Sequence, residues 1–243
     1  MTEVQTELRT QGYSLVHGKR LGIDREARDA TAELAAEWDN LEPDNYLKNG
    51  ATFRERRYGR FCYVPATGTA RLLEHQPYFQ SENANAYAGG IHRVVAPITD
   101  VSLKNPLLNT LIEFNFAQFP VAADDPRREQ SWEVACHQFR IIGRVDELGE
   151  PTPEGIHRDE IDYGAIHLLR RTNVAGGLSR VFDNDKNLIA EFALEEPLDT
   201  LFWADQQVLH SVTPITPADS GEVAVRDILI LGYRCAPGLS ENN

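Results

Sequence analysis

The sequence is poor in the features that mark membrane proteins and nucleic-acid-binding proteins. No apolar run approaches the roughly 20 residues that cross a bilayer, and no apolar segment follows a basic start. Lys and Arg number 24 against 37 Asp and Glu, a net charge of −13. A nucleic acid or an anionic membrane would require a basic footprint. We therefore expect a cytoplasmic protein with a small-molecule partner and no nucleic-acid or membrane partner.

Cysteine is scarce and shows no pattern. Cys62, Cys136 and Cys235 form no C-x-x-C pair, and an odd count without a secretion signal predicts reduced thiols. Neither a disulfide scaffold nor a zinc ribbon is indicated. Internal repeats and low-complexity tracts are absent as well. A chain of 243 residues with 42% hydrophobic residues can bury a substantial core, so we predict a single domain, 1–243.

Helical patterns occur in the first half of the chain. Asp24 can cap a helix near 24–40, in which apolar residues recur four positions apart. Asn105 can cap a second helix, because a proline suited to the first helical position and a helical repeat of leucines follow it. We expect this second helix to end before Pro120.

The second half of the chain has the pattern of a β core. From about Trp132 onward, short runs rich in β-branched and aromatic residues alternate with clusters of Gly, Pro, Asn and Asp. This rhythm is typical of an antiparallel barrel or sandwich. We therefore predict an α+β fold, with helices and some strand in about 1–130 packed outside a β core of about 131–236.

The stretch "PEGIHRDEIDYGAIHLL" places His157 and Asp159 two residues apart at the start of an apolar run. An H-x-[DE] pattern is expected roughly once by chance in such a chain, so it needs context. In an extended strand, residues i and i+2 face the same side and could meet one metal ion. His210, on another expected strand, would complete the two-histidine, one-carboxylate triad of non-haem Fe(II). An ordinary polar strand residue is the alternative for each.

Arg226 stands at the head of the apolar run "RDILILGYR". A buried arginine on the strand after the second histidine can hold the distal carboxylate of a dicarboxylate cosubstrate through a bidentate pair. The alternative is a strand-end residue that reaches solvent. The order His-x-Asp, then His, then Arg favours the anion anchor.

The motifs "HRD", "GGLS", "HSVTPI" and "RDILILGYR" resemble the double-stranded β-helix (jelly-roll, cupin-like) core of the Fe(II)/2-oxoglutarate-dependent dioxygenases. "PEGIHRDEIDYGAIHLL" followed by "NVAGGLSRVFD" is similar to the bacterial branch that hydroxylates free L-amino acids, typified by isoleucine 4-hydroxylase. The resemblance runs from about Trp132 to Arg234, and "FRERRYGRF" is a looser match before it.

The resemblance implies a set of site residues. His157, Asp159 and His210 would bind Fe(II), and Arg226 would bind 2-oxoglutarate. Many relatives have Ser two residues after this arginine, whereas this chain has Ile228, so a second donor to the cosubstrate carboxylate must come from another residue.

The function implied is hydroxylation of a free aliphatic L-amino acid, or a close derivative, with 2-oxoglutarate and O2 converted to succinate and CO2. The alternative is a non-oxidative cupin-like metalloprotein, a divalent-metal hydrolase, isomerase or binding protein that uses the same three ligands. Arg226 separates the two, because an anion anchor serves 2-oxoglutarate and has no equally specific purpose in a hydrolase. A catalytically inactive barrel would have no need of all four residues.

Strand parity suggests further cavity or substrate-binding residues. His167 has the parity of His157 and Asp159, although a satisfied core histidine is the alternative. Gln138 and Arg140 share one strand face, either a cavity wall or a solvated face. The adjacent Cys136 and His137 point to opposite faces and cannot form a catalytic dyad.

Four arginines gather within "FRERRYGRF", where local positive charge could attract an anionic ligand to an acidic chain. Parity places Arg54, Arg56 and Arg60 on one face with Tyr58, and Arg57 on the other. Arg54 and Arg57 are thus candidates from opposite faces for binding a substrate carboxylate. A solvated strand edge is the alternative.

Overall fold

The long strands of the protein form one antiparallel sheet. In this computed structural model, which describes residues 1–219 and 221–239, the sheet has eight strands. Their order is β1-β10-β6-β13-β5-β3-β2, and β4 pairs with β3. The strands are β1 (Tyr13–Val16), β2 (Glu42–Pro43), β3 (Arg54–Val64), β4 (Thr69–Leu72), β5 (Trp132–Gly143), β6 (Tyr163–Thr172), β10 (Thr200–Ala204) and β13 (Ala224–Cys235).

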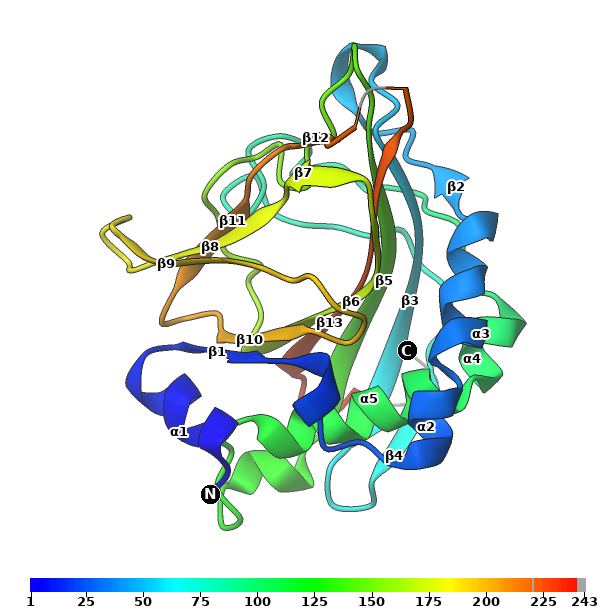
Figure 1. The fold of residues 1–243 in the computed structure, drawn as a ribbon. Helices are drawn as coiled ribbons and strands as arrows, with labels where there is room; N and C mark the ends of the chain where they lie inside the picture. The colour runs from blue at the N-terminus through cyan, green and yellow to red at the C-terminus, as the bar shows by residue number, and fades with distance from the viewer. Residues whose placement is uncertain (220, 240–243) are drawn as a thin grey trace.

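Two smaller antiparallel sheets face one side of this sheet (Figure 1). The first has the order β11-β8-β9 and the second pairs β12 with β7. Their strands are β7 (Val174–Gly176), β8 (Leu178–Phe182), β9 (Leu188–Ala193), β11 (Leu209–Val212) and β12 (Ile215–Pro217). Together with the long strands they make the predicted jelly-roll core, so the α+β, double-stranded β-helix prediction is confirmed.

The helices cover the other side of the main sheet and its lower end in Figure 1. They are α1 (Glu3–Thr10), α2 (Arg25–Asp29), α3 (Thr31–Ala36), α4 (Asp100–Lys104) and α5 (Pro106–Gln118). Short 3-10 turns occupy Gly18–Arg20, Glu37–Asn40, Lys48–Gly50 and Pro126–Glu129. The flanking helices expected from the sequence are therefore present.

One predicted helix is continuous and the other is broken. Asn105 caps α5 by accepting a hydrogen bond from the backbone N–H of Leu107 at 2.9 Å, and α5 ends before Pro120 as expected. The single helix predicted near 24–40 is wrong, because the segment divides into α2, α3 and a 3-10 turn. At the break, the Thr31 hydroxyl donates to the carbonyl of Arg28 at 2.7 Å, a local bond that competes with the helical ladder.

The core lies between the helices and one face of the main sheet. Leu34, Trp38, Leu111, Ile112 and Phe116 pack there against alternate residues of β5 and β13. On β5 this face carries Trp132, Val134, Cys136 and Gln138, which are 0% exposed. The residues between them, including His137 and Phe139, face the opposite side of the sheet, where the jelly roll closes around a cavity.

The two parts of the chain share the main sheet. Strand β1 pairs with β10, and β3 pairs with β5 along ten residue pairs. This sharing supports the predicted single domain, 1–243. In the part of the chain that the structure describes, no helix is long and apolar enough to span a membrane. The three cysteines are free thiols, and Cys62 and Cys136 are buried.

Candidate active site

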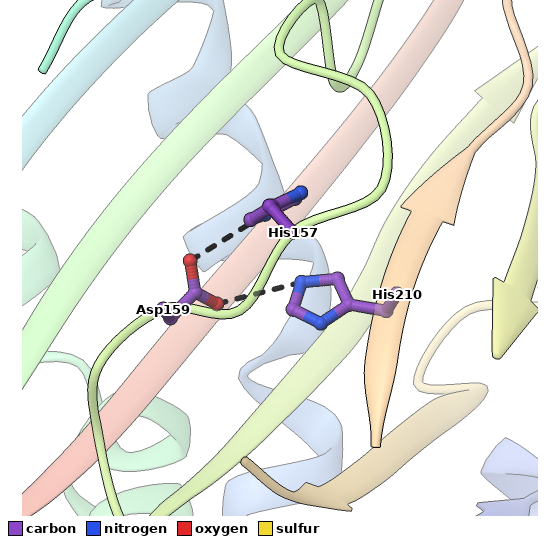
Figure 2. A group of neighbouring side chains, drawn as sticks. All are labelled: His157, Asp159 and His210. Carbon is purple, nitrogen blue, oxygen red and sulfur yellow. Dashed lines mark ion pairs between the residues drawn. The ribbon is translucent and has the colours of Figure 1, made fainter. Parts of the chain in front are cut away.

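Three predicted metal ligands meet at the wall of the cavity (Figure 2). One ligand atom from each of His157, Asp159 and His210 lies within 4.8 Å of the others. Each oxygen of the Asp159 carboxylate faces one imidazole, with Oδ1 3.6 Å from Nε2 of His157 and Oδ2 3.5 Å from Nε2 of His210. The fold therefore brings the three predicted side chains together.

The backbone holds the two histidines as a pair. His157 and His210 form an isolated antiparallel bridge, in which each N–H donates to the carbonyl of the other at 3.1 and 3.0 Å. Asp159 follows in a loop and not in a strand, so the expectation that His157 and Asp159 share a strand face is wrong. Their side chains converge because the loop, and not strand alternation, turns Asp159 toward the histidines.

Hydrogen bonding orients Nε2 of His157 toward the metal site. Its Nδ1 donates to the carbonyl of Gly155 at 2.9 Å, which leaves Nε2 as the nitrogen that binds a metal ion once its proton is lost. Burial raises the pKa of Asp159, but the hydrogen bond from His157 and the charge of His210 outweigh it and hold that pKa well below its usual value. Two imidazoles and an ionised carboxylate are donors that suit Fe(II).

Asp205 positions the loop that carries Asp159. Its Oδ1 accepts from the backbone N–H of Asp159 at 3.0 Å and from Nε1 of Trp203 at 3.2 Å, and its Oδ2 accepts from the N–H of Ile161 at 3.2 Å. Gly164 makes room for the indole, since a Cβ there would lie 2.1 Å from the Trp203 ring. Burial and the charge of Asp159 raise the pKa of Asp205 to about 6. Asp205 is not among the predicted residues, and its only sequence signal is its place after the apolar strand "TLFWA".

The cavity beside the triad has a volume of about 620 Å³. Its walls come from β3, β5, β6 and β13 on one side and from β11 and the segment 76–93 on the other. The apolar part of the wall is rich in isoleucine, with Ile141, Ile166, Ile228 and Ile230. A space of this size accommodates a small cosubstrate and a small substrate together.

Arg226 lines the same cavity and is 0% exposed. None of its three guanidinium nitrogens has a hydrogen-bond partner among residues 1–219 and 221–239. Burial, with a contribution from the charge of Arg171, lowers its pKa to about 10, so it remains a cation at neutral pH. A buried cation without a partner is energetically costly, and binding an anion relieves that cost. The predicted anchor for a carboxylate therefore fits the structure.

His167 does not line the cavity, and its assignment to the cavity by parity is wrong. Its Nε2 accepts from Asn115 at 3.0 Å and its Nδ1 bonds the Thr200 hydroxyl at 2.8 Å, on the helix-facing side of β6. Burial lowers its pKa to about 3, so it is neutral. Parity fails because a loop with Glu160 at φ 61° separates Asp159 from the first residue of β6.

Gln138 and Arg140 also lie on the helix-facing side of the sheet, so their assignment to a cavity wall is wrong. Gln138 donates to the Ser102 hydroxyl at 2.9 Å. Arg140 makes two 2.8 Å hydrogen bonds to the carboxylate of Asp227. The β5 side chains that do line the cavity, among them His137 and Phe139, have the opposite parity.

The parity predicted for the arginines of β3 is confirmed. Arg54, Arg56 and Arg60 line the cavity. Arg57 faces away and donates to the carbonyls of Asn40 and Pro97 at 2.9 Å, so its candidacy as a substrate-binding residue is wrong. Further cavity residues that the sequence did not predict are Tyr78, Arg93, His137 and Glu154.

Comparison with known proteins gives consistent matches. The model of the 2OG-Fe dioxygenase family matches residues 35–232. L-isoleucine-4-hydroxylase of Bacillus thuringiensis is 27% identical over 228 residues, 93% of this chain and 92% of that protein. The 3(1)-hydroxy-L-isoleucine 4-dioxygenase of Pantoea ananatis is 25% identical over 243 residues, covering 96% of each protein.

Solved structures extend these matches to the fold. A bsmA homologue from Methylobium petroleophilum PM1 superimposes with a TM-score of 0.86 at 32% identity, covering 98% of this chain and 94% of that one. IDO from Bacillus thuringiensis has a TM-score of 0.80 at 23% identity, covering 96% and 98% of the two chains. With the family match over most of the chain, and with a donor set that suits Fe(II) beside an unpaired buried arginine, the chain belongs to the 2OG-Fe dioxygenase family.

Proposed function

We propose that this dioxygenase hydroxylates a free aliphatic L-amino acid or a close derivative, with 2-oxoglutarate and O2 converted to succinate and CO2. The observation that carries the proposal is that the triad and the unpaired guanidinium of Arg226 line one cavity, whose wall is rich in isoleucine. The named activities of the Bacillus and Pantoea relatives support the choice of amino acid.

The roles of four residues follow from this proposal. His157, Asp159 and His210 hold Fe(II), and Arg226 binds the distal carboxylate of the 2-oxoglutarate cosubstrate through its two-donor fork. The metal and the cosubstrate together supply the oxidising power that inserts one oxygen atom of O2 into a C–H bond. The second donor to the cosubstrate carboxylate is not assigned, because Ile228 offers none.

The chain itself contributes orientation and exclusion of water. The side chains of His157 and His210 are 8% exposed, and together with the apolar wall of the cavity they keep bulk water from the reacting C–H bond. The hydrogen bonds from Asp205 fix the loop of Asp159, so the carboxylate keeps its direction toward the histidines. We place the protein in the cytoplasm, a proposal supported by its free thiols.

The test is a screen of free L-amino acids with Fe(II), 2-oxoglutarate and O2. We expect succinate together with a product heavier by one oxygen atom, measured by mass spectrometry. Asp159→Ala should abolish both and weaken metal binding while the circular dichroism spectrum is kept. Asp185→Ala, which removes an exposed carboxylate far from the triad in sequence, is the matched control and should retain activity. Turnover of a substrate with zinc in the absence of oxygen would instead support the hydrolase alternative.

A further inference from the structure

Besides Arg226, a second group of buried arginines lines the cavity. Arg54, Arg56 and Arg93 are 7%, 2% and 2% exposed. The buried carboxylate of Asp44 contacts two of them, Arg54 at 2.8 Å and Arg56 at 3.4 Å. Three guanidinium groups and one carboxylate leave a net charge of 3 − 1 = +2 in this wall. A buried net positive charge is stabilised when an anion binds beside it.

Within residues 1–219 and 221–239, Arg93 is the member of the group that forms no ion pair. Its Nη2 donates to the neutral Gln80 amide oxygen at 2.8 Å, and its Nε has no partner within the described part of the chain. Its guanidinium stacks on the ring of Tyr78 at 4.5 Å. Stacking fixes the plane of the group, and its Nε–H remains available to bind a carboxylate.

Arg56 and His137 present further donors in the same wall. Arg56 stacks on Phe139 at 4.6 Å, and its Nη2 donates to Nδ1 of His137 at 3.1 Å. Burial and the charge of Arg56 hold the pKa of His137 well below its usual value, so the ring is neutral. With Nδ1 as the acceptor, Nε2 of His137 carries the proton and is a donor. The wall is therefore equipped with donors and holds few acceptors.

The same cavity also carries acidic side chains. Glu154 lines the cavity 3.4 Å from Nε2 of His157, and Asp159 stands beside it. A substrate with a carboxylate is repelled from these acidic side chains and attracted to the arginines. The charges of the cavity therefore favour a pose in which the carboxylate lies against the arginines.

We infer that Arg93, with Arg56 and Arg54, forms the subsite that binds the α-carboxylate of the amino-acid substrate. The inference rests on the proposed function, which it deepens by assigning the group that recognises the substrate. It also separates the two anions that the enzyme must bind. The cosubstrate carboxylate is held at Arg226, and the substrate carboxylate is held at Arg93.

The first experiment uses the unaltered enzyme and a pair of probes, L-isoleucine and L-isoleucinamide. The amide keeps the ammonium group and the side chain but lacks the carboxylate charge. We expect the KM for the amide to be roughly 10- to 150-fold higher, the range for losing one charge-assisted hydrogen bond. If L-isoleucine is not turned over, the best amino acid of the screen and its amide replace the pair.

The second experiment asks whether Arg93 causes that discrimination. Arg93→Met should raise the KM for the amino acid by a similar factor, leave the KM for the cosubstrate within about twofold, and make the acid and the amide nearly equal. Arg93→Lys keeps the charge without the fork and should give an intermediate KM. Arg57→Met, on the opposite face of the strand that carries Arg56, is the matched control and should behave as the unaltered enzyme.

The outcomes separate the two proposals. If an amino acid is hydroxylated but its amide serves equally well, the subsite is wrong and the proposed function stands. The same conclusion follows if Arg93→Met raises the KM for the cosubstrate and leaves that for the amino acid unchanged. If no free amino acid is turned over, the proposed function and the subsite both fail. The amide comparison requires no variant, so misfolding of Arg93→Met does not remove the test.

Discussion

The two buried arginine sites of the cavity differ in what the fold already provides around them. Arg226 has no hydrogen-bond partner among the described residues. Arg56, by contrast, contacts Asp44 and His137 and stacks on an aromatic ring. A guanidinium without an anion destabilises the folded chain, whereas one with a partial set of partners contributes to its stability. The same type of side chain therefore serves binding alone at Arg226 and both binding and folding at Arg56.

The largest effect is expected from Asp44→Asn, which removes the only carboxylate paired with Arg54 and Arg56 in the described chain. Breaking a buried pair by removing one partner costs about 3–5 kcal/mol. Urea unfolding should show a loss of this size. A loss below about 1 kcal/mol would mean that the arginine cluster does not depend on Asp44, and the contrast with Arg226 would disappear.

A smaller effect is expected from Arg226→Lys, which keeps the charge and loses the two-donor fork. A lost charge-assisted hydrogen bond costs about 1.5–3 kcal/mol, roughly a tenfold to more than hundredfold rise in the KM for the 2-oxoglutarate cosubstrate. Metal affinity and the identity of the product should stay the same, because the triad is untouched. An unchanged KM would place the cosubstrate carboxylate elsewhere, with Arg54 and Arg56 the next residues to test.

Arg226→Met and Arg56→Met should change the free energy of unfolding in opposite directions. Without cosubstrate, Arg226→Met removes an unpaired buried cation and fills the space with an apolar chain of similar length. We expect the free energy of unfolding to rise by about 1 kcal/mol or more. Arg56→Met should lower it, because Asp44 loses a partner. Thermal unfolding of both variants in cosubstrate-free buffer measures the difference, and a fall for both would contradict the distinction.

The smallest effect concerns pH. Burial raises the pKa of Asp44, but the charges of Arg54 and Arg56 outweigh it and hold that pKa below its usual value near 3.9. A carboxylate with a depressed folded-state pKa stabilises the protein above its unfolded-state pKa, and this contribution is lost as the pH falls through the folded-state pKa. The stability difference between the unaltered protein and Asp44→Asn should therefore be full at pH 6 and shrink below about pH 4. Urea unfolding at a series of pH values tests this, and a constant difference would contradict it.

The sequence was sufficient to predict the site residues that belong to a recognisable motif. His157, Asp159, His210 and Arg226 lie around one cavity as predicted, although Asp159 reaches the histidines from a loop and not from a strand. Strand parity was sufficient on β3, where Arg54 and Arg57 separate as expected.

Strand parity gave wrong cavity assignments on β5 and β6, where one strand face is not clearly the cavity face or where the strand is not continuous with the motif. Both faces of β5 are buried, one under helices and one inside the jelly roll, so alternation does not identify the face with the cavity and does not distinguish Gln138 from His137. For His167, a loop lies between Asp159 and β6, so the alternation of strand faces does not continue from Asp159 to His167. Arg93 lies outside any named strand, where no periodicity exists to reveal it.

The backbone bridge between His157 and His210 has a consequence for metal identity. Because their backbones are paired, we expect the two imidazoles to keep nearly the same separation when an ion binds. Such a donor pair adjusts little to the ionic radius or the preferred geometry of the ion, and intrinsic affinity for nitrogen and oxygen donors increases from iron toward copper. Discrimination among divalent ions is then left to the metal supply of the cell. Protein purified from a rich medium should carry a mixture of metals, and only its iron fraction should be active.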